Sequence, residues 1–243
     1  MPRFLARAPA RLFLAVMLAG SALITWYSLP YFDFETLPPF VIEKFPVRFE
    51  KLWLFSLRLH VAAASLSFPL CLVLLTRWLQ RRPAWHRRLG RAAGVIVVLG
   101  LIPSGTVLAF DAKGGTVVTV GFLLSAGIVV WGMVSGVIAA RKRDLVAHRR
   151  AMLHVVAQMS VAVVSRALLV VFDATGVDPD LAYVLALWVP VPGSVLVVEI
   201  RNVSLSRYSN KIKFIIGRIR HELSSLPLVS PRPIVRVVAR PGR

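Results

Sequence analysis

Residues 117–140 read VVTVGFLLSAGIVVWGMVSGVIAA, and none of these side chains carries a charge. An apolar run of this length exceeds the roughly 20 residues that an α-helix needs to cross the hydrocarbon core of a bilayer. Five more stretches have the same character, so the sequence predicts six membrane-spanning segments: 12–29, 53–75, 92–110, 117–140, 152–171 and 181–198. Because lipid offers no hydrogen bonds to backbone groups, these segments should be helices. The expected fold class is therefore all-α, a polytopic membrane helix bundle.

The charged residues that flank these segments predict the orientation of the chain. The net charge is +19, and 24 of the 30 lysine and arginine residues fall on one side of the expected membrane. Short loops rich in lysine and arginine stay in the cytoplasm, so both termini are predicted to be cytoplasmic. The basic residues border apolar segments and form no separate basic domain, which argues against a nucleic-acid partner. The expected partner is the lipid bilayer, including its anionic lipids.

Four sections are predicted along the 243 residues of the chain. Residues 1–51 contain the first membrane helix and an outer loop, and residues 52–202 form a five-helix membrane core. Residues 203–226 place isoleucine and leucine on one helical face and basic residues elsewhere, which predicts an amphipathic tail helix at an anionic membrane surface. The prolines of residues 227–243 predict a disordered tail.

The motifs of common soluble enzymes are missing from the sequence. It contains no Walker loop, no HExxH pair, no nucleophile elbow and no CxxC pair. The single cysteine, Cys71, excludes an intrachain disulfide and a thiolate metal cluster. These observations favour a non-enzymatic protein over an enzyme.

Two ionisable residues lie inside predicted membrane segments, His60 in the second and Arg166 in the fifth. Both are predicted at similar depth, in the half of the membrane near the outer surface. An ionisable group at such a position is costly to bury, so we expect it to bind a ligand or to line the gate of a small transporter. The alternative is a structural ion pair, with Asp111 or Asp173 as the partner of Arg166.

Two further histidines precede the third and fifth segments, in the tripeptides His86-Arg87-Arg88 and His148-Arg149-Arg150. His154 lies about two helical turns beyond His148. His86 with His148 or His154 could supply the axial ligands of haem b, which would make the chain a membrane redox protein. The four arginines could instead bind anionic lipid at the helix N-termini, or they could only set the topology.

Residues 57–202 resemble the bacterial membrane family catalogued as domain of unknown function 2306. The resemblance is carried by the His60 segment, HRRLGR at 86–91, the glycine-rich fourth segment, RDL at 143–145 leading to AHRRAM at 147–152, Arg166, and the aromatic and proline residues of 188–192. It implies a multi-pass protein of the bacterial inner membrane and no particular activity. The bundle is also distantly similar to transmembrane b-type cytochromes, which pair histidines at matched depths on both sides, whereas His60 has no such partner.

The primary hypothesis is an integral membrane protein of unknown biochemical activity that binds a lipid or small ligand within its helix bundle. The candidate ligand-binding residues are His60, Arg166, His86, His148 and His154, and the candidate lipid-binding residues are Arg87, Arg88, Arg149 and Arg150. Two alternatives stand beside it. One is a redox protein that holds haem b through the histidines, and the other is a small transporter with its gate near His60 and Arg166.

Overall fold

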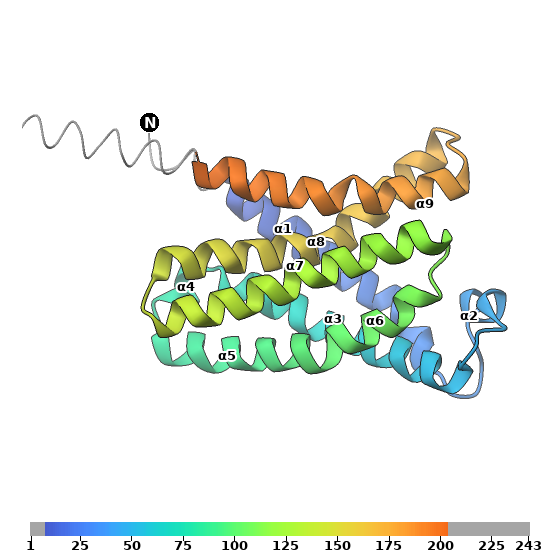
Figure 1. Ribbon diagram of the computed structural model, residues 1–243, viewed down its shortest axis with the longest axis horizontal. Helices are drawn as coiled ribbons and strands as arrows, with labels where there is room; N and C mark the ends of the chain where they lie inside the picture. The colour runs from blue at the N-terminus through green and yellow to red at the C-terminus, as the bar shows by residue number, and fades with distance from the viewer. Residues whose placement is uncertain (1–7, 204–243) are drawn as a thin grey trace, which may run out of the picture. The chain divides into compact units, whose positions relative to one another are not determined.

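The computed structural model describes residues 8–203, and every regular element in that range is a helix (Figure 1). Six helices in this range are long and apolar enough to cross a membrane: Arg11–Phe32, Glu50–Leu74, Pro83–Phe110, Gly115–Arg141, Leu145–Ala174 and Pro179–Val203. Each of them contains most of one predicted segment. The expected all-α, multi-pass membrane bundle is thus confirmed.

Short connections join most of the helices. In chain order the elements are α1 (Ala8–Ser28), η1 (Leu29–Phe32), α2 (Pro39–Lys44), α3 (Glu50–Leu74), α4 (Arg77–Gln80), α5 (Pro83–Val95), η2 (Ile96–Leu101), α6 (Ile102–Phe110), α7 (Gly115–Arg141), α8 (Leu145–Ala174) and α9 (Pro179–Trp188), and a last helix occupies 190–203. The chain forms two compact units, Met1–Ile200 and Arg201–Arg243, and the packing below is that of the first. Apart from residue 203, the expected tail helix at 203–226 and disordered tail at 227–243 lie outside the described residues.

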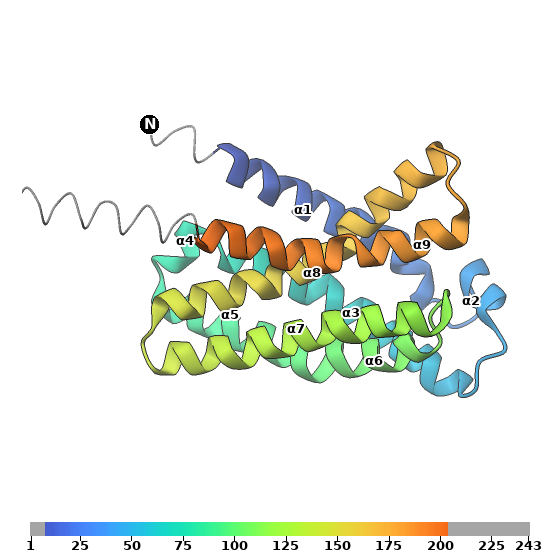
Figure 2. The ribbon, with the colours of Figure 1, turned by 45° about the horizontal axis from the view of Figure 1, so that its top comes forward.

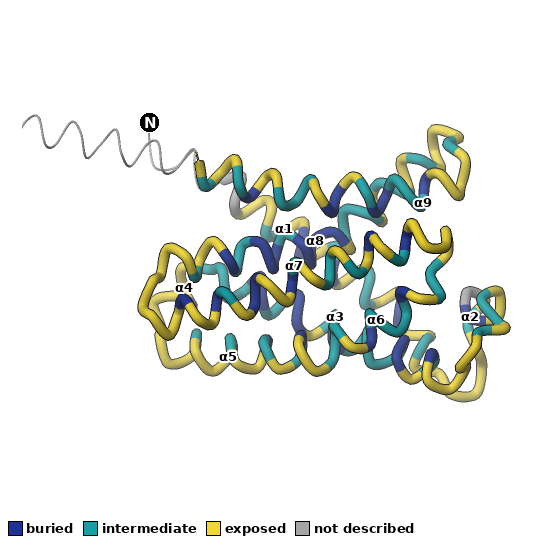
Figure 3. Tube along the Cα trace, in the orientation of Figure 1, coloured by how far each residue is buried: buried dark blue, intermediate teal, exposed yellow. Residues whose placement is uncertain are grey.

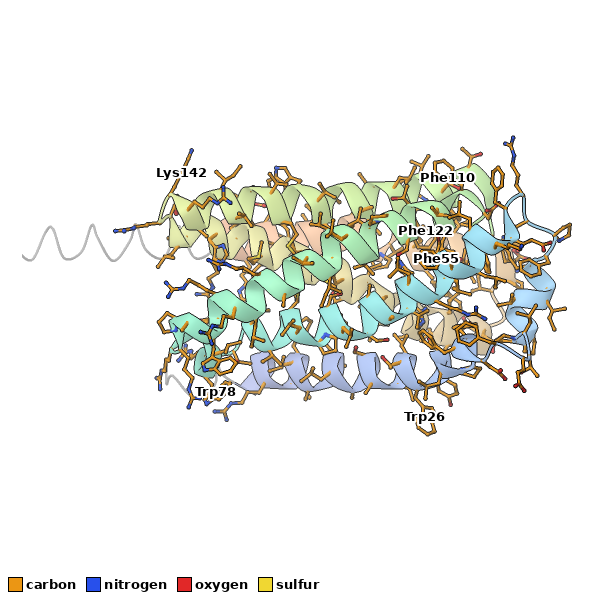
Figure 4. All side chains as sticks on the ribbon, turned by 90° about the horizontal axis from the view of Figure 1, so that it is seen from below. Trp26, Phe55, Trp78, Phe110, Phe122 and Lys142 are labelled. Carbon is orange, nitrogen blue, oxygen red and sulfur yellow. The ribbon has the colours of Figure 1, made fainter. Side chains whose placement is uncertain are left out.

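The connections alternate between two ends of the bundle. Segments 75–82 and 142–144 form what is called here the arginine-rich end, and segments 29–49, 111–114 and 175–178 form the opposite end, called the loop end. Trp78 and Lys142 lie at the arginine-rich end, whereas Phe55 and Phe110 lie toward the loop end (Figure 4).

Two of the six spans contain a local irregularity next to proline. The third span runs as α5, the π-helical turn η2 and α6, where Pro103 lacks the N–H that would continue the regular hydrogen bonding. The sixth span changes at Val189 from α9 to the helix 190–203, beside Pro190. In the third span, Ser104 Oγ donates to the carbonyl oxygen of Gly100 at 2.5 Å and gives the widened turn a side-chain partner.

α7 and α8 form an antiparallel hairpin with the most extensive helix–helix contact of the bundle (Figure 2). The carboxylate of Asp144 caps the start of α8 by accepting hydrogen bonds from the backbone N–H groups of Val146 and Ala147, at 3.1 and 2.9 Å. Gly132 allows the close approach further along, because a Cβ at that position would lie 3.1 Å from the carbonyl oxygen of Ala151.

Two of the three buried apolar clusters lie between several of the long helices. The larger one joins α1, α3, the third span, α7 and α8, and includes Phe68, Leu72, Val97, Val155 and Met159. The smaller one, toward the loop end, consists of Val118, Val161, Leu187 and Val191. Many other large apolar side chains are exposed, along α1 and α7 among other places (Figure 3). That surface suits contact with lipid acyl chains, which are as apolar as leucine.

Candidate functional site

The polar side chains within the spans form separate groups rather than one site. The loop-end group contains His60, Ser104 and Arg166, with Tyr31 and Tyr183 as electrostatic neighbours of the arginine. The clasp consists of Arg150, His154 and Glu199. The buried amide network consists of Ser125, Gln158 and Ser194. His86 and His148 form a fourth group, the histidine pair.

His60 lies in the loop-end half of α3 and faces the third span. Its Nδ1 is 3.2 Å from the carbonyl oxygen of Leu101, the last residue of η2, and 3.4 Å from Ser104 Oγ. Because a carbonyl oxygen only accepts, Nδ1 carries the hydrogen and Nε2 keeps a lone pair. Gly105 leaves the room for the ring, since a Cβ there would lie 2.9 Å from His60 Cε1.

Arg166 lies eight residues before the end of α8, which places its Cα about 12 Å from that helix end. Its Nη1 donates to the carbonyl oxygen of Ala162 at 2.9 Å, one turn further from the loop end. The guanidinium is therefore directed along α8 away from the loop end, and Arg166 is one of the exposed residues of that helix. A side chain that reached for the nearer membrane surface would point the other way.

The surroundings of Arg166 contain no compensating carboxylate among the described residues. The ion pairs of this part of the chain are Lys113–Asp180, Arg150–Glu199 and His154–Glu199. Neither of the two expected partners, Asp111 and Asp173, pairs with it. Of the 11 acidic residues in the sequence, only Glu222 lies outside the described range. The electrostatic neighbours of Arg166 are instead His60, Tyr31 and Tyr183.

The clasp joins α8 to the last helix near the arginine-rich end. His154 is only 2% exposed, and its Nε2 donates to Glu199 Oε1 at 2.7 Å. Arg150, one turn earlier on α8, donates from Nη2 to Glu199 Oε2 at 2.5 Å and from Nε to Oε1 at 3.2 Å. The ring of His154 also meets Trp131 of α7 edge to face, with centroids 5.5 Å apart. Three helices therefore meet at this one imidazole.

One turn beyond His154, Gln158 is 3% exposed and has partners for both ends of its amide. Its Nε2 donates to the carbonyl oxygen of Val191 and to Ser194 Oγ, both at 2.9 Å, and its Oε1 accepts from Ser125 Oγ at 2.9 Å. Residues 150, 154 and 158 follow each other at intervals of four along α8, so one helix face presents all three to the last helix.

The apolar cluster of Val118, Val161, Leu187 and Val191 separates this polar face from the loop-end group. On α8, Val161 stands between Gln158 and Arg166 in the chain. The same order holds on the sixth span, where Leu187 lies between Tyr183 and Ser194. The two polar groups are therefore separated by buried aliphatic side chains, an arrangement that lends no support to a transport path between them.

His86 and His148 interact electrostatically at the arginine-rich end. His148 Nδ1 donates to the carbonyl oxygen of Gly136 at 2.8 Å, which leaves Nε2 with a lone pair. Nδ1 of His86 is buried without a hydrogen-bond partner in the described part of the chain. Of the two expected haem-ligand pairs, His86 with His148 is the one that shows an electrostatic interaction. His154 uses its Nε2 on Glu199 instead, and residues 8–203 hold no cluster of three or more His, Cys, Asp or Glu suited to a metal ion.

The four arginines expected to bind lipid fall into two classes. Arg87, Arg88 and Arg149 are exposed at the arginine-rich end, and the guanidinium of Arg88 lies 5.9 Å from the ring centroid of Trp85. Arg150 is engaged with Glu199. Only the first three are free of a carboxylate within the described residues.

Sequence reasoning did not find Glu199, Gln158, Ser125 and Ser194. It ended the sixth span at residue 198, whereas the helix continues to residue 203 and places Glu199 opposite α8. The signal was present in the interval of four between Arg150, His154 and Gln158. Polar residues at that interval in an apolar helix indicate a face packed against protein rather than lipid.

Neither a curated protein nor a solved structure matches this chain. The family model described as predicted membrane protein (DUF2306) matches residues 57–201. That range covers more than half of the 243 residues and contains every group above except Tyr31. It also coincides with the segment that the sequence motifs single out. The protein is a member of the DUF2306 family of multi-pass membrane proteins.

Proposed function

We propose that the protein binds an anionic group in the loop-end half of its bundle, with Arg166 as the binding cation. The ligand would be a lipid or small molecule that carries a phosphate or carboxylate. The observation that carries the proposal is the direction of Arg166: its Nη1 bonds to the carbonyl oxygen of Ala162, away from the nearer surface, and no described carboxylate pairs with it.

The energetic argument rests on the position of the charge. A charged side chain within a membrane span is costly unless it reaches water or a partner of opposite charge. The neighbours of Arg166, namely His60, Tyr31 and Tyr183, carry no negative charge near neutral pH. A bound anion would supply the missing charge, and such charge-assisted hydrogen bonds are about twice as strong as neutral ones.

The donor inventory of the site fits that ligand. A guanidinium has five N–H groups, and the hydrogen bond to Ala162 uses one of them. The remaining groups can take a phosphate or carboxylate in the two-point geometry that arginine favours. Phenol and imidazole groups nearby offer further hydrogen bonds to the same ligand.

We propose in addition that the arginine-rich end faces the cytoplasm of a bacterial inner membrane. The excess of lysine and arginine in the loops of that end supports this orientation. Arg166 would then lie in the outer half of the membrane. The exposed Arg87, Arg88 and Arg149 would lie at the cytoplasmic surface, where anionic lipid headgroups are a second proposed ligand.

Native mass spectrometry of the full-length protein in uncharged detergent tests the main proposal. The probes are dodecyl phosphate, which mimics a lipid headgroup with its chain, and inorganic phosphate, which represents a soluble anion. Arg166→Gln should lose the tightest dodecyl phosphate adduct or weaken it roughly tenfold, the loss of one charged hydrogen-bonding group. Binding of inorganic phosphate with the same sensitivity to Arg166 would identify a soluble ligand instead.

Arg141→Gln is the matched control, because it removes the same charge from an exposed residue at the arginine-rich end that is not among the proposed lipid-binding arginines. It should leave the tightest adduct unchanged. Equal losses in the two variants would show a response to net charge alone and overturn the proposal, as would wild-type binding of both probes by Arg166→Gln.

A further inference from the structure

A second pair of cations at the loop end, Lys51 and Arg58, lies on α3. A hollow of about 500 Å³ opens there on the lateral surface of the second span. Its walls include Phe34, Phe55, Leu59 and Ala62, and its two cations are Lys51 and Arg58. We propose that this hollow binds an anionic phospholipid from the leaflet at the loop end.

The guanidinium of Arg58 is held in place by uncharged groups. Its Nε donates to the carbonyl oxygen of Tyr31 at 2.9 Å, and its Nη2 donates to the carbonyl oxygen of Asp33 at 3.0 Å. The ring of Phe34 lies beneath it, with the guanidinium carbon 4.0 Å from the centroid. These two hydrogen bonds use two of five N–H groups, so three stay available to a ligand.

No carboxylate forms an ion pair with either cation within the described residues, although Asp33 is an electrostatic neighbour of Arg58. The ion pairs there involve neither Lys51 nor Arg58. The side chain of Asp33 is turned to its own loop, where it accepts hydrogen bonds from the Thr36 hydroxyl and from the backbone N–H of Glu35. A zwitterionic lipid would bring a positive group close to the two cations of this site. An anionic lipid would bring only negative charge, which is complementary to them.

The arrangement along α3 fits a lipid rather than a soluble anion. Positions 51, 55, 58 and 62 recur at intervals of four, three and four, so they share one face of the helix. Lys51 stands one residue from the start of α3, and Arg58 lies about two turns deeper. A phosphate between them would leave the acyl chain beside Leu59, Ala62 and, one turn further, Leu66, which is exposed.

This proposal does not depend on Arg166, which lies on another helix, although both arginines have Tyr31 as a neighbour. It also assigns a role to Arg58 beyond reaching for the surface. Arginine that only seeks water need not be clamped by two carbonyl oxygens and an aromatic ring. The clamp holds the guanidinium in one position, which reduces the entropy lost when a phosphate binds.

Lipid binding to the full-length protein in mixed micelles tests the proposal, with native mass spectrometry as the readout. The probes are phosphatidylglycerol and phosphatidylcholine with identical acyl chains. Wild type should bind phosphatidylglycerol more tightly, and Arg58→Gln should weaken that binding roughly tenfold, as expected for one lost charged hydrogen-bonding group. Arg48→Gln is the matched control, since Arg48 is exposed at the same end and does not line the hollow.

Because Arg58 also holds the backbone of Tyr31 and Asp33, two further variants separate binding from local folding. Lys51→Gln keeps those hydrogen bonds and removes the second charge, so it should also lower the preference for phosphatidylglycerol. Ala62→Trp fills the hollow and should weaken both lipids. If binding falls in Arg58→Gln but stays at the wild-type level in Lys51→Gln and Ala62→Trp, the loop alone was disturbed and the proposal is overturned. The same conclusion follows if Arg48→Gln loses as much affinity as Arg58→Gln.

Discussion

His154 Nε2 donates a hydrogen bond of 2.7 Å to Glu199 Oε1, and this contact ties the last helix to α8 inside the bundle. The same carboxylate binds Arg150 through two further hydrogen bonds. Because the imidazole is 2% exposed, removal of the carboxylate leaves its N–H without its partner at a position that is buried in the intact protein. The clasp should therefore matter to stability through the group left behind as much as through the bond itself.

Replacing Glu199 by alanine should destabilise the protein by about 1–3 kcal/mol, the cost of a buried donor without a partner. Glu199→Gln should be milder, because its amide oxygen can still accept from His154. Thermal unfolding of the two variants in detergent, followed by tryptophan fluorescence, checks this order. Trp131 packs on His154 and should report the change locally. A Glu199→Ala variant as stable as wild type would show that the clasp contributes nothing.

Gln158 should couple energetically to Ser125, because the serine hydroxyl donates to the amide oxygen at 2.9 Å. A double-mutant cycle with Ser125→Ala and Gln158→Leu isolates that one contact. Comparable hydrogen bonds within membranes average about 0.6 kcal/mol and reach about 1.7. We expect a coupling energy in that range. Strict additivity of the two changes would mean that the hydrogen bond makes no net contribution.

Gly132→Ala should weaken the α7–α8 hairpin. A Cβ at residue 132 would lie 2.7 Å from Val155 Cγ2 and 3.1 Å from the carbonyl oxygen of Ala151, and the backbone atom cannot move aside cheaply. We expect a loss of about 1–3 kcal/mol in the free energy of unfolding, typical of overpacking. Gly127→Ala on the same helix is the control, since nothing lies within 4 Å of its Cβ position. That variant should be neutral or more stable, because alanine favours the helix.

Asp33 offers a pH-dependent contact outside the spans. Hydrogen bonds from the Thr36 side chain and from the backbone N–H groups of Glu35 and Thr36 lower the pKa of its carboxyl group below 3.8. Because the pKa of Asp33 is lower in the folded state, its ionised carboxylate contributes to folding stability above the pKa of the unfolded state. That contribution to stability is lost as the pH falls through the pKa of the folded state. Thr36→Val removes the first of these causes, so the pKa of Asp33 should rise. Carboxyl NMR of aspartate-labelled protein measures it, and an unchanged pKa would contradict the assignment.

The sequence alone predicts the membrane-spanning helices of the bundle. It does not predict the side-chain contacts between them. Hydropathy and length predict the spans because both are properties of consecutive residues. The similar depth of His60 and Arg166 also follows from counting residues along two helices. The rotation of each helix about its axis does not follow, since it depends on contacts such as Gly132 against Ala151. For that reason His154, expected as an alternative haem-ligand partner of His86, meets Glu199 instead.

Removal of the charge should therefore affect the stability of the protein in opposite ways at Arg166 and at Glu199. Arg166→Leu leaves no described carboxylate without its partner, and the carbonyl of Ala162 loses only an additional hydrogen bond. Leucine suits a membrane span better than arginine by about 3 kcal/mol at its centre. We expect the midpoint of thermal unfolding to stay unchanged or rise, while binding of dodecyl phosphate falls. A marked loss of stability would instead place Arg166 among the structural contacts of the bundle, and its proposed role as an anion-binding cation would then be wrong.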